Sequence, residues 1–237
     1  VDLAQQIDAG RPAKGIMAVL QRPAGGLVTL ADEGITSPKQ LAGRKVGVTG
    51  VPSDNVVFDQ IVSDAGGDPA DSDLITIGFT GVQALKAGRI SAFTGYVPAD
   101  ATAVEADGQK TRSFLLDENG GPSYPGLVAF STEDEIAGDP ELMKGFVEAT
   151  TRGYQDALAD PKASTDALAS QADGVDRKIA LDTFNAYVPL IGPPDGVGVF
   201  DEKDLTDLSD FLIEGDLIKE PIAPDRYATN EFTSAGN

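Results

Sequence analysis

Short apolar runs and helix-like apolar repeats alternate along most of the chain. A short apolar run predicts a strand, and apolar residues three or four positions apart predict a helix. Alternation of the two is typical of α/β folds. In chain order, we expect strands at 13–20, 27–30, 45–49, 72–78, 90–96, 112–116 and 127–131, and helices at 1–10, 54–65, 81–88, 99–107, 141–158, 162–171, 176–188 and 201–214.

The sequence pattern of residues 37–66 indicates a ligand-binding site. A short apolar strand leads into the turn Gly50-Val51-Pro52, and either Ser53 or Asp54 is expected to cap the helix that follows. A strand that ends in a glycine turn and feeds a helix brings free backbone N–H groups together. Ligands of open α/β folds bind at such a point. We therefore expect Gly50, Val51, Pro52, Ser53 and Asp54 to face a ligand, although plain helix capping explains Ser53 and Asp54 equally well.

Asp54 also bears on the kind of ligand. A carboxylate at a helix N-terminus cancels the partial positive charge that would hold sulfate or nitrate there. An ionised carboxylate only accepts hydrogen bonds. A ligand that carries hydrogen-bond donors, such as an aminopyrimidine, therefore suits Asp54 better than an oxyanion does.

Further candidate contacts lie at or just after the ends of other predicted strands. Thr80 precedes the helix at 81–88, and Gly95, Tyr96 and Asp100 lie where the strand at 90–96 ends. Tyr96 could instead be a half-buried strand end, and Asp100 a helix-start residue. Gln21 follows the strand at 13–20 and is a candidate contact from the first lobe.

The pattern predicts two lobes of unequal make-up. Residues 31–127 look like a complete small α/β domain, and residues 1–30 with 128–237 look like parts of a second one. The run at 120–125 reads as a crossover between them. Tyr124, between Pro122 and Pro125, is a candidate hinge aromatic at the border of a cleft, and simple hinge packing would explain it as well.

Composition excludes several kinds of chemistry and several partners. The 237 residues carry a formal charge of −20 and contain no Cys, His or Trp. Thiolate nucleophiles, Ser-His-Asp triads, histidine bases and zinc sites with nitrogen or sulfur ligands are therefore excluded. A chain with 38 acidic and 18 basic residues is a poor partner for nucleic acid or an anionic membrane surface. No apolar run approaches the roughly 20 residues of a membrane helix, and we expect no metal and no cofactor.

Several stretches resemble the substrate-binding proteins of ABC importers, in the family that binds thiamine precursors, sulfonates or nitrate. The matching runs are Gly34-Ile35-Thr36-Ser37-Pro38-Lys39-Gln40-Leu41-Ala42-Gly43-Arg44-Lys45-Val46-Gly47-Val48, Gly50-Val51-Pro52-Ser53-Asp54, Ala87-Gly88-Arg89-Ile90-Ser91-Ala92, Gly215-Asp216-Leu217-Ile218-Lys219-Glu220-Pro221 and Thr229-Asn230-Glu231-Phe232. The Gly-Val-Pro-Ser-Asp turn and the Thr-Asn-Glu-Phe tail are most similar to the thiamine-pyrimidine branch.

The resemblance implies a periplasmic-binding-protein-like (type II) fold, in which two α/β lobes joined by a hinge close around a ligand. The thiamine-precursor branch tends to have an aromatic pair and a carboxylate near the end of the strand at 90–96. The resemblance implies that Tyr96 and Asp100 take these roles, although this sequence has no second aromatic beside Tyr96. Members of the family carry a further stretch before the equivalent of Val1. Either this chain is truncated or its first lobe is rebuilt.

The resemblance further implies an extracytoplasmic, non-enzymatic protein that hands a small polar molecule to ABC permease subunits. We expect a monomer, attached to the cell surface by a lipid if an N-terminal segment provides the anchor. A thiamine-pyrimidine precursor is the preferred ligand, while sulfonates, nitrate and riboflavin-like solutes stay open. The fold family also contains thiamine-pyrimidine synthases. Those enzymes look dependent on His and Cys, and this chain contains neither residue, so a synthase is disfavoured. A ligand-sensing module and a remnant that no longer binds also stay open.

Overall fold

A computed structural model describes residues 1–234 and 236. The chain divides into two compact units: unit 1 consists of Val1–Pro23 and Pro122–Asn237, and unit 2 of Ala24–Gly121. The first boundary precedes the one expected at residue 30, because the strand at 25–30 pairs within the sheet of unit 2. Within the described residues, no helix combines the length and the apolar character needed to cross a membrane.

Unit 2 is built on a five-stranded mixed sheet with the order β4-β3-β5-β2-β6. β3 runs parallel to both β4 and β5, whereas β2 runs antiparallel to both β5 and β6. Four strands therefore point the same way and β2 opposes them. Their bounds are β2 Gly25–Leu30, β3 Lys45–Val48, β4 Asp73–Thr76, β5 Ala92–Tyr96 and β6 Thr111–Leu115.

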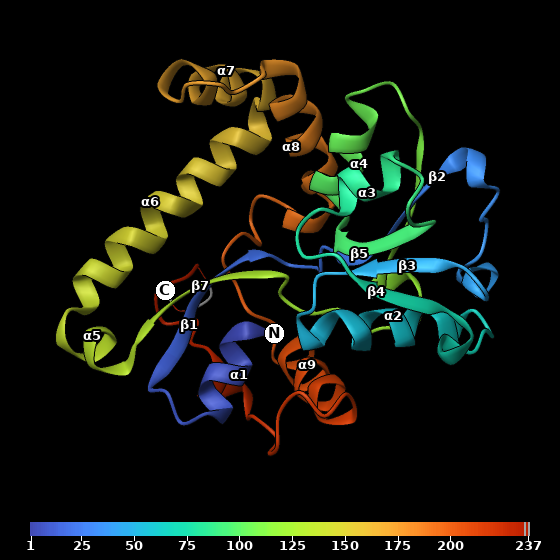
Figure 1. Ribbon diagram of the computed structural model, residues 1–237. Coiled ribbons are helices and arrows are strands. Elements are labelled where there is room, and N and C mark those ends of the chain that lie inside the picture. Colours follow the sequence, from blue (N-terminus) through green and yellow to red (C-terminus); the bar gives the residue numbers. More distant parts are fainter. Residues whose placement is uncertain (235, 237) are drawn as a thin grey trace. The chain divides into compact units, whose positions relative to one another are not determined.

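Helices cover both faces of this sheet (Figure 1). α2 (Pro52–Asp64) lies on one face and buries Val57, Phe58, Ile61 and Val62. α3 (Gly81–Lys86) and α4 (Val97–Glu105) lie on the other face, around the buried ring of Phe93 on β5. Every strand and helix predicted for this unit is present, with ends shifted by a few residues.

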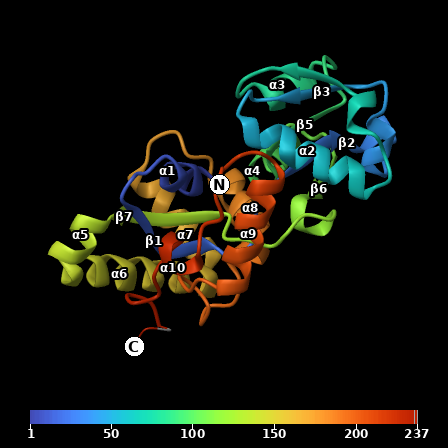
Figure 2. The same ribbon diagram turned by 90° about the horizontal axis from the view of Figure 1, so that it is seen from below.

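Unit 1 contains a two-stranded antiparallel sheet of β1 (Ala13–Leu20) and β7 (Leu127–Thr132). Figure 2 shows the long helix α6 beside this pair. Two residues of β1 that pair with β7 also form isolated bridges to other segments: Gly15 bridges to Ala228, and Ala18 bridges to Gly198. The helices of this unit are α1 Asp2–Asp8, α5 Glu133–Gly138, α6 Pro140–Ala159, α7 Pro161–Gln171, α8 Arg177–Ile191, α9 Glu202–Glu214 and α10 Pro224–Tyr227.

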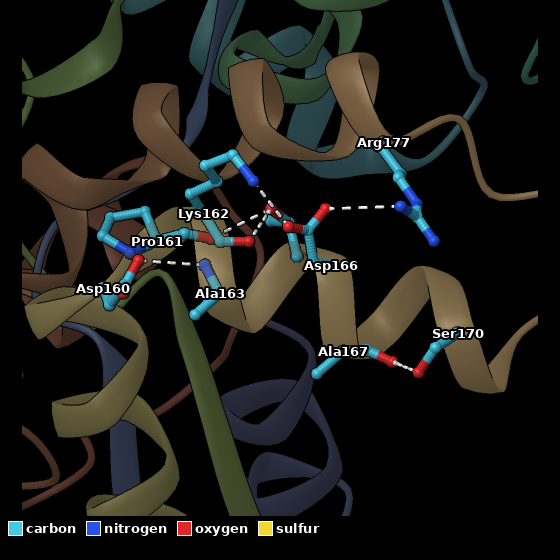
Figure 3. A network of polar contacts seen from close by, with 9 residues as sticks. Asp160, Pro161, Lys162, Ala163, Asp166, Ala167, Ser170 and Arg177 are labelled. Carbon is cyan, nitrogen blue, oxygen red and sulfur yellow. Dashed lines mark hydrogen bonds and ion pairs between the residues drawn. The ribbon is translucent and has the colours of Figure 1, made fainter.

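Aspartates begin the long helices of unit 1. At α7, Asp160 accepts a hydrogen bond from the backbone of Ala163, which satisfies one N–H of the first turn (Figure 3). Asp166, further along α7, forms ion pairs with Lys162 at 2.7 Å and with Arg177 on α8 at 3.8 Å. The Lys162 pair lies within α7 and the Arg177 pair links α7 to α8; both are exposed and add little stability.

The Thr-Asn-Glu-Phe run near the C-terminus has a structural role within unit 1. The side chain of Asn230 accepts a hydrogen bond from the Phe200 N–H at 2.8 Å and donates one to the Phe200 carbonyl at 2.9 Å. The Thr229 N–H donates to the Gly15 carbonyl on β1. The tail is thereby fixed against β1 and the loop before α9.

Candidate ligand-binding site

The topology of unit 2 gathers most of the candidate residues at one edge of its sheet. Because β3, β4, β5 and β6 all point the same way, their carboxyl ends lie at the same edge, here called the carboxyl edge. Ligands of open α/β sheets bind outside this edge. Nine of the predicted contacts lie at this edge, either at the end of β5 or shortly after β3, β4 or β5. They are Gly50, Val51, Pro52, Ser53, Asp54, Thr80, Gly95, Tyr96 and Asp100.

The turn after β3 is held by Asp54. Its Oδ2 accepts hydrogen bonds from the Thr49 backbone N–H at 2.7 Å and from the Thr49 hydroxyl at 2.5 Å. Gly50 has φ +97°, a conformation that favours glycine. The turn is therefore shaped by its own hydrogen bonds before any ligand arrives.

The expectation that Ser53 or Asp54 caps α2 is wrong. The N-cap is Val51, which makes no side-chain cap bond, and the helix begins at Pro52. Proline suits the first helical position because it has no N–H to satisfy. Asp54 lies within the first turn and points back to Thr49 instead. Because both bonds from Thr49 end on Oδ2, Oδ1 is the oxygen that remains for a ligand donor among the described residues.

The turn after β4 presents an aromatic ring to solvent. The Ile77 N–H donates to the Val48 carbonyl at 2.8 Å, and the Thr80 hydroxyl donates to the Ile77 carbonyl at 2.7 Å. Gly78 adopts φ +57° between them. The side chain of Phe79 is 88% exposed. The hydroxyl proton of Thr80 is thus engaged within the turn, and only its lone pairs remain for a ligand.

The end of β5 places a tyrosine and a carboxylate together. Tyr96 is 59% exposed. A Cβ atom added to Gly95 would lie 2.2 Å from Oδ2 of Asp100, so the carboxylate of Asp100 packs directly on the Gly95 backbone. Burial raises the pKa of Asp100, and a hydrogen bond from the Tyr96 backbone partly opposes that shift.

The carboxyl edge is acidic. The stretches 49–54, 77–81, 95–100 and 116–121 lie at the ends of the four parallel strands and contain Asp54, Asp100, Asp117 and Glu118 but no Lys or Arg. These four stretches therefore offer carboxylate acceptors to a ligand and contribute no positive side chain to an oxyanion. In the described part of the chain, no cluster of Asp and Glu side chains has an arrangement that could hold a metal ion.

The two remaining candidates, Gln21 and Tyr124, belong to unit 1. The side-chain amide of Gln21 donates to the carbonyls of Ala18 and Gly196, both at 3.2 Å. Tyr124 is only 5% exposed and stacks on Phe211 of α9, with 6.3 Å between ring centroids. Both side chains thus have packing roles within unit 1, and a ligand contact from either one stays a prediction.

Phe79 is a candidate contact that the sequence pattern did not predict. The pattern offered no second aromatic beside Tyr96 on the same strand, and this ring comes from a different turn. The available signal was an isolated aromatic between Gly78 and Thr80-Gly81, where a strand joins a helix. Exposure on that turn distinguishes Phe79 from an apolar residue that continues the preceding strand.

Comparison with known proteins places the chain in a family. The family described as "NMT1/THI5 like" matches residues 1–164, well over half of the chain. The chain therefore belongs to the NMT1/THI5-like family, as its sequence motifs indicated.

Three curated relatives cover much of the chain. A formylaminopyrimidine-binding protein of Halalkalibacterium halodurans is 23% identical over 225 residues, which are 92% of this chain and 68% of that protein. A riboflavin-binding protein of Chloroflexus aurantiacus is 24% identical over 96% of this chain and 67% of its own length. A 4-amino-5-hydroxymethyl-2-methylpyrimidine phosphate synthase of Legionella pneumophila is 28% identical over 61% of this chain and 46% of its own length.

Solved structures confirm the predicted fold class. The periplasmic aliphatic sulphonate binding protein of Escherichia coli aligns with a TM-score of 0.73 and 14% identity, over 96% of this chain and 76% of that chain. At this identity the likeness establishes the fold alone. The chain therefore has the α/β fold of periplasmic solute-binding proteins.

Proposed function

We propose that this protein is the extracytoplasmic solute-binding component of an ABC importer and that it binds a thiamine-pyrimidine precursor. The observation that carries the ligand class is the carboxylate of Asp54, held by Thr49 at an edge that also presents Asp100 and Tyr96 and lacks Lys and Arg. Relatives that bind a formylaminopyrimidine and riboflavin support a nitrogen heterocycle as the ligand.

An aminopyrimidine matches this edge group by group. Its amino group and protonatable ring nitrogens supply donors for the carboxylates, and its flat ring supplies a face for Tyr96. Gly95 lets the Asp100 carboxylate approach the strand backbone, which holds that acceptor close to the end of β5. Closure of the second lobe over the bound ring and delivery to permease subunits complete the proposed transport role.

Oxyanions and covalent chemistry fit less well. In the four stretches that form this edge, a sulfonate or nitrate ion would meet four acidic residues and no side-chain cation. A synthase activity would lack histidine and cysteine, since the chain contains neither. We therefore propose binding and transport without bond chemistry.

A thermal-shift screen tests this function. The purified chain is melted with 4-amino-5-hydroxymethyl-2-methylpyrimidine, its formylamino relative, thiamine, riboflavin, taurine and nitrate. At 100 times the dissociation constant, a ligand that binds only the native state adds about 2.7 kcal/mol, which raises Tm by about 5–10 °C for a chain of this size. A saturable rise with a pyrimidine supports the proposal. A rise with taurine or nitrate and none with any ring compound would refute it.

A further inference from the structure

Phe79 combines high exposure with a fixed position. At 88% exposed, it is the most exposed large hydrophobic side chain of the described residues, ahead of Tyr96 at 59%. A single exposed apolar residue is common on protein surfaces and carries no inference alone. The turn that carries Phe79, however, is held on both sides, by the Ile77 bond to Val48 and by the Thr80 bond to Ile77.

The start of α3 fixes this turn against the sheet as well. A Cβ atom on Gly81 would lie 2.3 Å from the ring of Phe93, so the backbone at Gly81 already touches the buried core. The backbone two residues after Phe79 is therefore anchored on the core of unit 2. A ligand would meet the ring already in place, which lowers the entropy cost of binding.

The order of the strands places Phe79 on the other side of the Asp54 turn from Tyr96. β3 lies between β4 and β5, so the ends of β4, β3 and β5 give the sequence aromatic, carboxylate, aromatic along the carboxyl edge. β4 and β5 are two strand spacings apart, which is about 10 Å. Aromatic pairs interact with ring centroids about 4.5–7 Å apart, so two rings about 9–14 Å apart can both contact one ring between them.

From this placement we infer that Phe79 is a ligand contact that, together with Tyr96, selects for a planar ring, while Asp54 accepts hydrogen bonds from the edge of that ring. This inference rests on the proposed function and adds a specificity determinant to it. Two aromatic surfaces favour a flat heterocycle over an aliphatic solute of similar polarity, because only the heterocycle offers a ring for them to contact.

Phe79→Ala tests the inference by isothermal titration with the ring compound that the wild-type chain binds most tightly in the thermal-shift screen. Loss of an aromatic stacking surface is expected to weaken binding about tenfold or more. The Tm of the unliganded variant should equal that of the wild type, because the side chain is exposed. Phe146→Ala, on α6 in unit 1, removes another exposed phenyl ring and should leave the affinity unchanged.

Phe79→Trp provides a second readout that does not depend on loss of function. The chain has no tryptophan, so the substitution introduces a single tryptophan, whose emission can be excited separately from that of the five tyrosines. Its emission should change saturably with the ring compound, whereas that of Phe146→Trp should not. An affinity of Phe79→Ala within twofold of the wild type, or unchanged emission of Phe79→Trp at saturation, would overturn the inference and leave the proposed function standing. Failure of the wild type to bind any ring compound would overturn both.

Discussion

The carboxylate of Asp54 accepts two hydrogen bonds from Thr49, one from its backbone N–H and one from its hydroxyl. This pair closes the turn between β3 and α2 and orients the remaining carboxylate oxygen at the carboxyl edge. A polar group that is held in place by its neighbours loses little freedom when it meets a ligand. The pair therefore connects the local fold of the turn to the proposed recognition of hydrogen-bond donors.

Asp54→Ala is expected to reduce both stability and ligand affinity. Hydrogen bonds to a charged group contribute about 1.5–3 kcal/mol when buried, and the partial exposure of Asp54 lowers the expected loss to about 1 kcal/mol. Chemical denaturation measures the loss. Ser53→Ala is the matched control, since Val51 and not Ser53 is the N-cap. A loss of about 1 kcal/mol in Ser53→Ala would instead indicate that Ser53 caps the helix.

Gly95→Ala should be clearly destabilising, whereas Gly25→Ala on the neighbouring strand should not. The new Cβ at position 95 would lie 2.2 Å from Oδ2 of Asp100, and the added Cβ at position 25 meets nothing within 4 Å. Displacing the carboxylate is expected to cost about 1–3 kcal/mol, measured by denaturation. Equal effects of the two substitutions would contradict the close packing of Asp100 on Gly95.

Asp100 should make a measurable contribution to the pH dependence of stability. Burial raises its pKa above that of an exposed aspartate, so the folded chain binds this proton more tightly than the unfolded chain does. The contribution of Asp100 is therefore most favourable below the unfolded pKa and is lost as the pH rises through the folded pKa.

Asp100→Asn removes that dependence. The variant should be more stable than the wild type at neutral pH and equally stable at a pH below both pKa values, when measured by denaturation across the pH range. A variant that is less stable than the wild type at neutral pH would show that the ionised carboxylate is stabilised by its surroundings and not penalised by them.

Thr94→Val is expected to stabilise the protein by about 1 kcal/mol. Thr94 lies on β5 at 3% exposed, and its hydroxyl oxygen has no hydrogen-bond partner among the described residues. Valine has nearly the same shape and leaves no polar atom unsatisfied. Denaturation midpoints of the unliganded variant and wild type give the difference. A loss of stability would indicate that the Thr94 hydroxyl is satisfied in solution, for example by an ordered water.

Much of the fold could be predicted from local pattern. Strands such as Lys45–Val48 and helices such as Pro140–Ala159 follow from apolar periodicity and from the Gly and Pro residues that bound them. The assignment of Gly25–Leu30 to a unit could not be predicted in this way. It depends on pairing with strands more than 60 residues away, and a short apolar run carries no information on its partner.

The site could be predicted in part, for a physical reason. The glycine turn and the strand ends pointed to one edge of the sheet, because parallel strands bring their carboxyl ends together. The hydrogen bonds of Asp54 could not be predicted, since an aspartate in a first helical turn can cap the helix or turn back to a nearby hydroxyl. The sequence could not show that Tyr124 is buried and Phe79 exposed, because the burial of a side chain depends on the tertiary structure.

The most direct test is to locate the ligand on the chain. Backbone amide chemical shifts of the labelled protein are followed by NMR during titration with 4-amino-5-hydroxymethyl-2-methylpyrimidine. We expect saturable shifts in unit 2 at Thr49, Asp54, Phe79, Tyr96 and Asp100. Saturable binding that leaves these five amides unperturbed would contradict the assignment of the carboxyl edge as the ligand site.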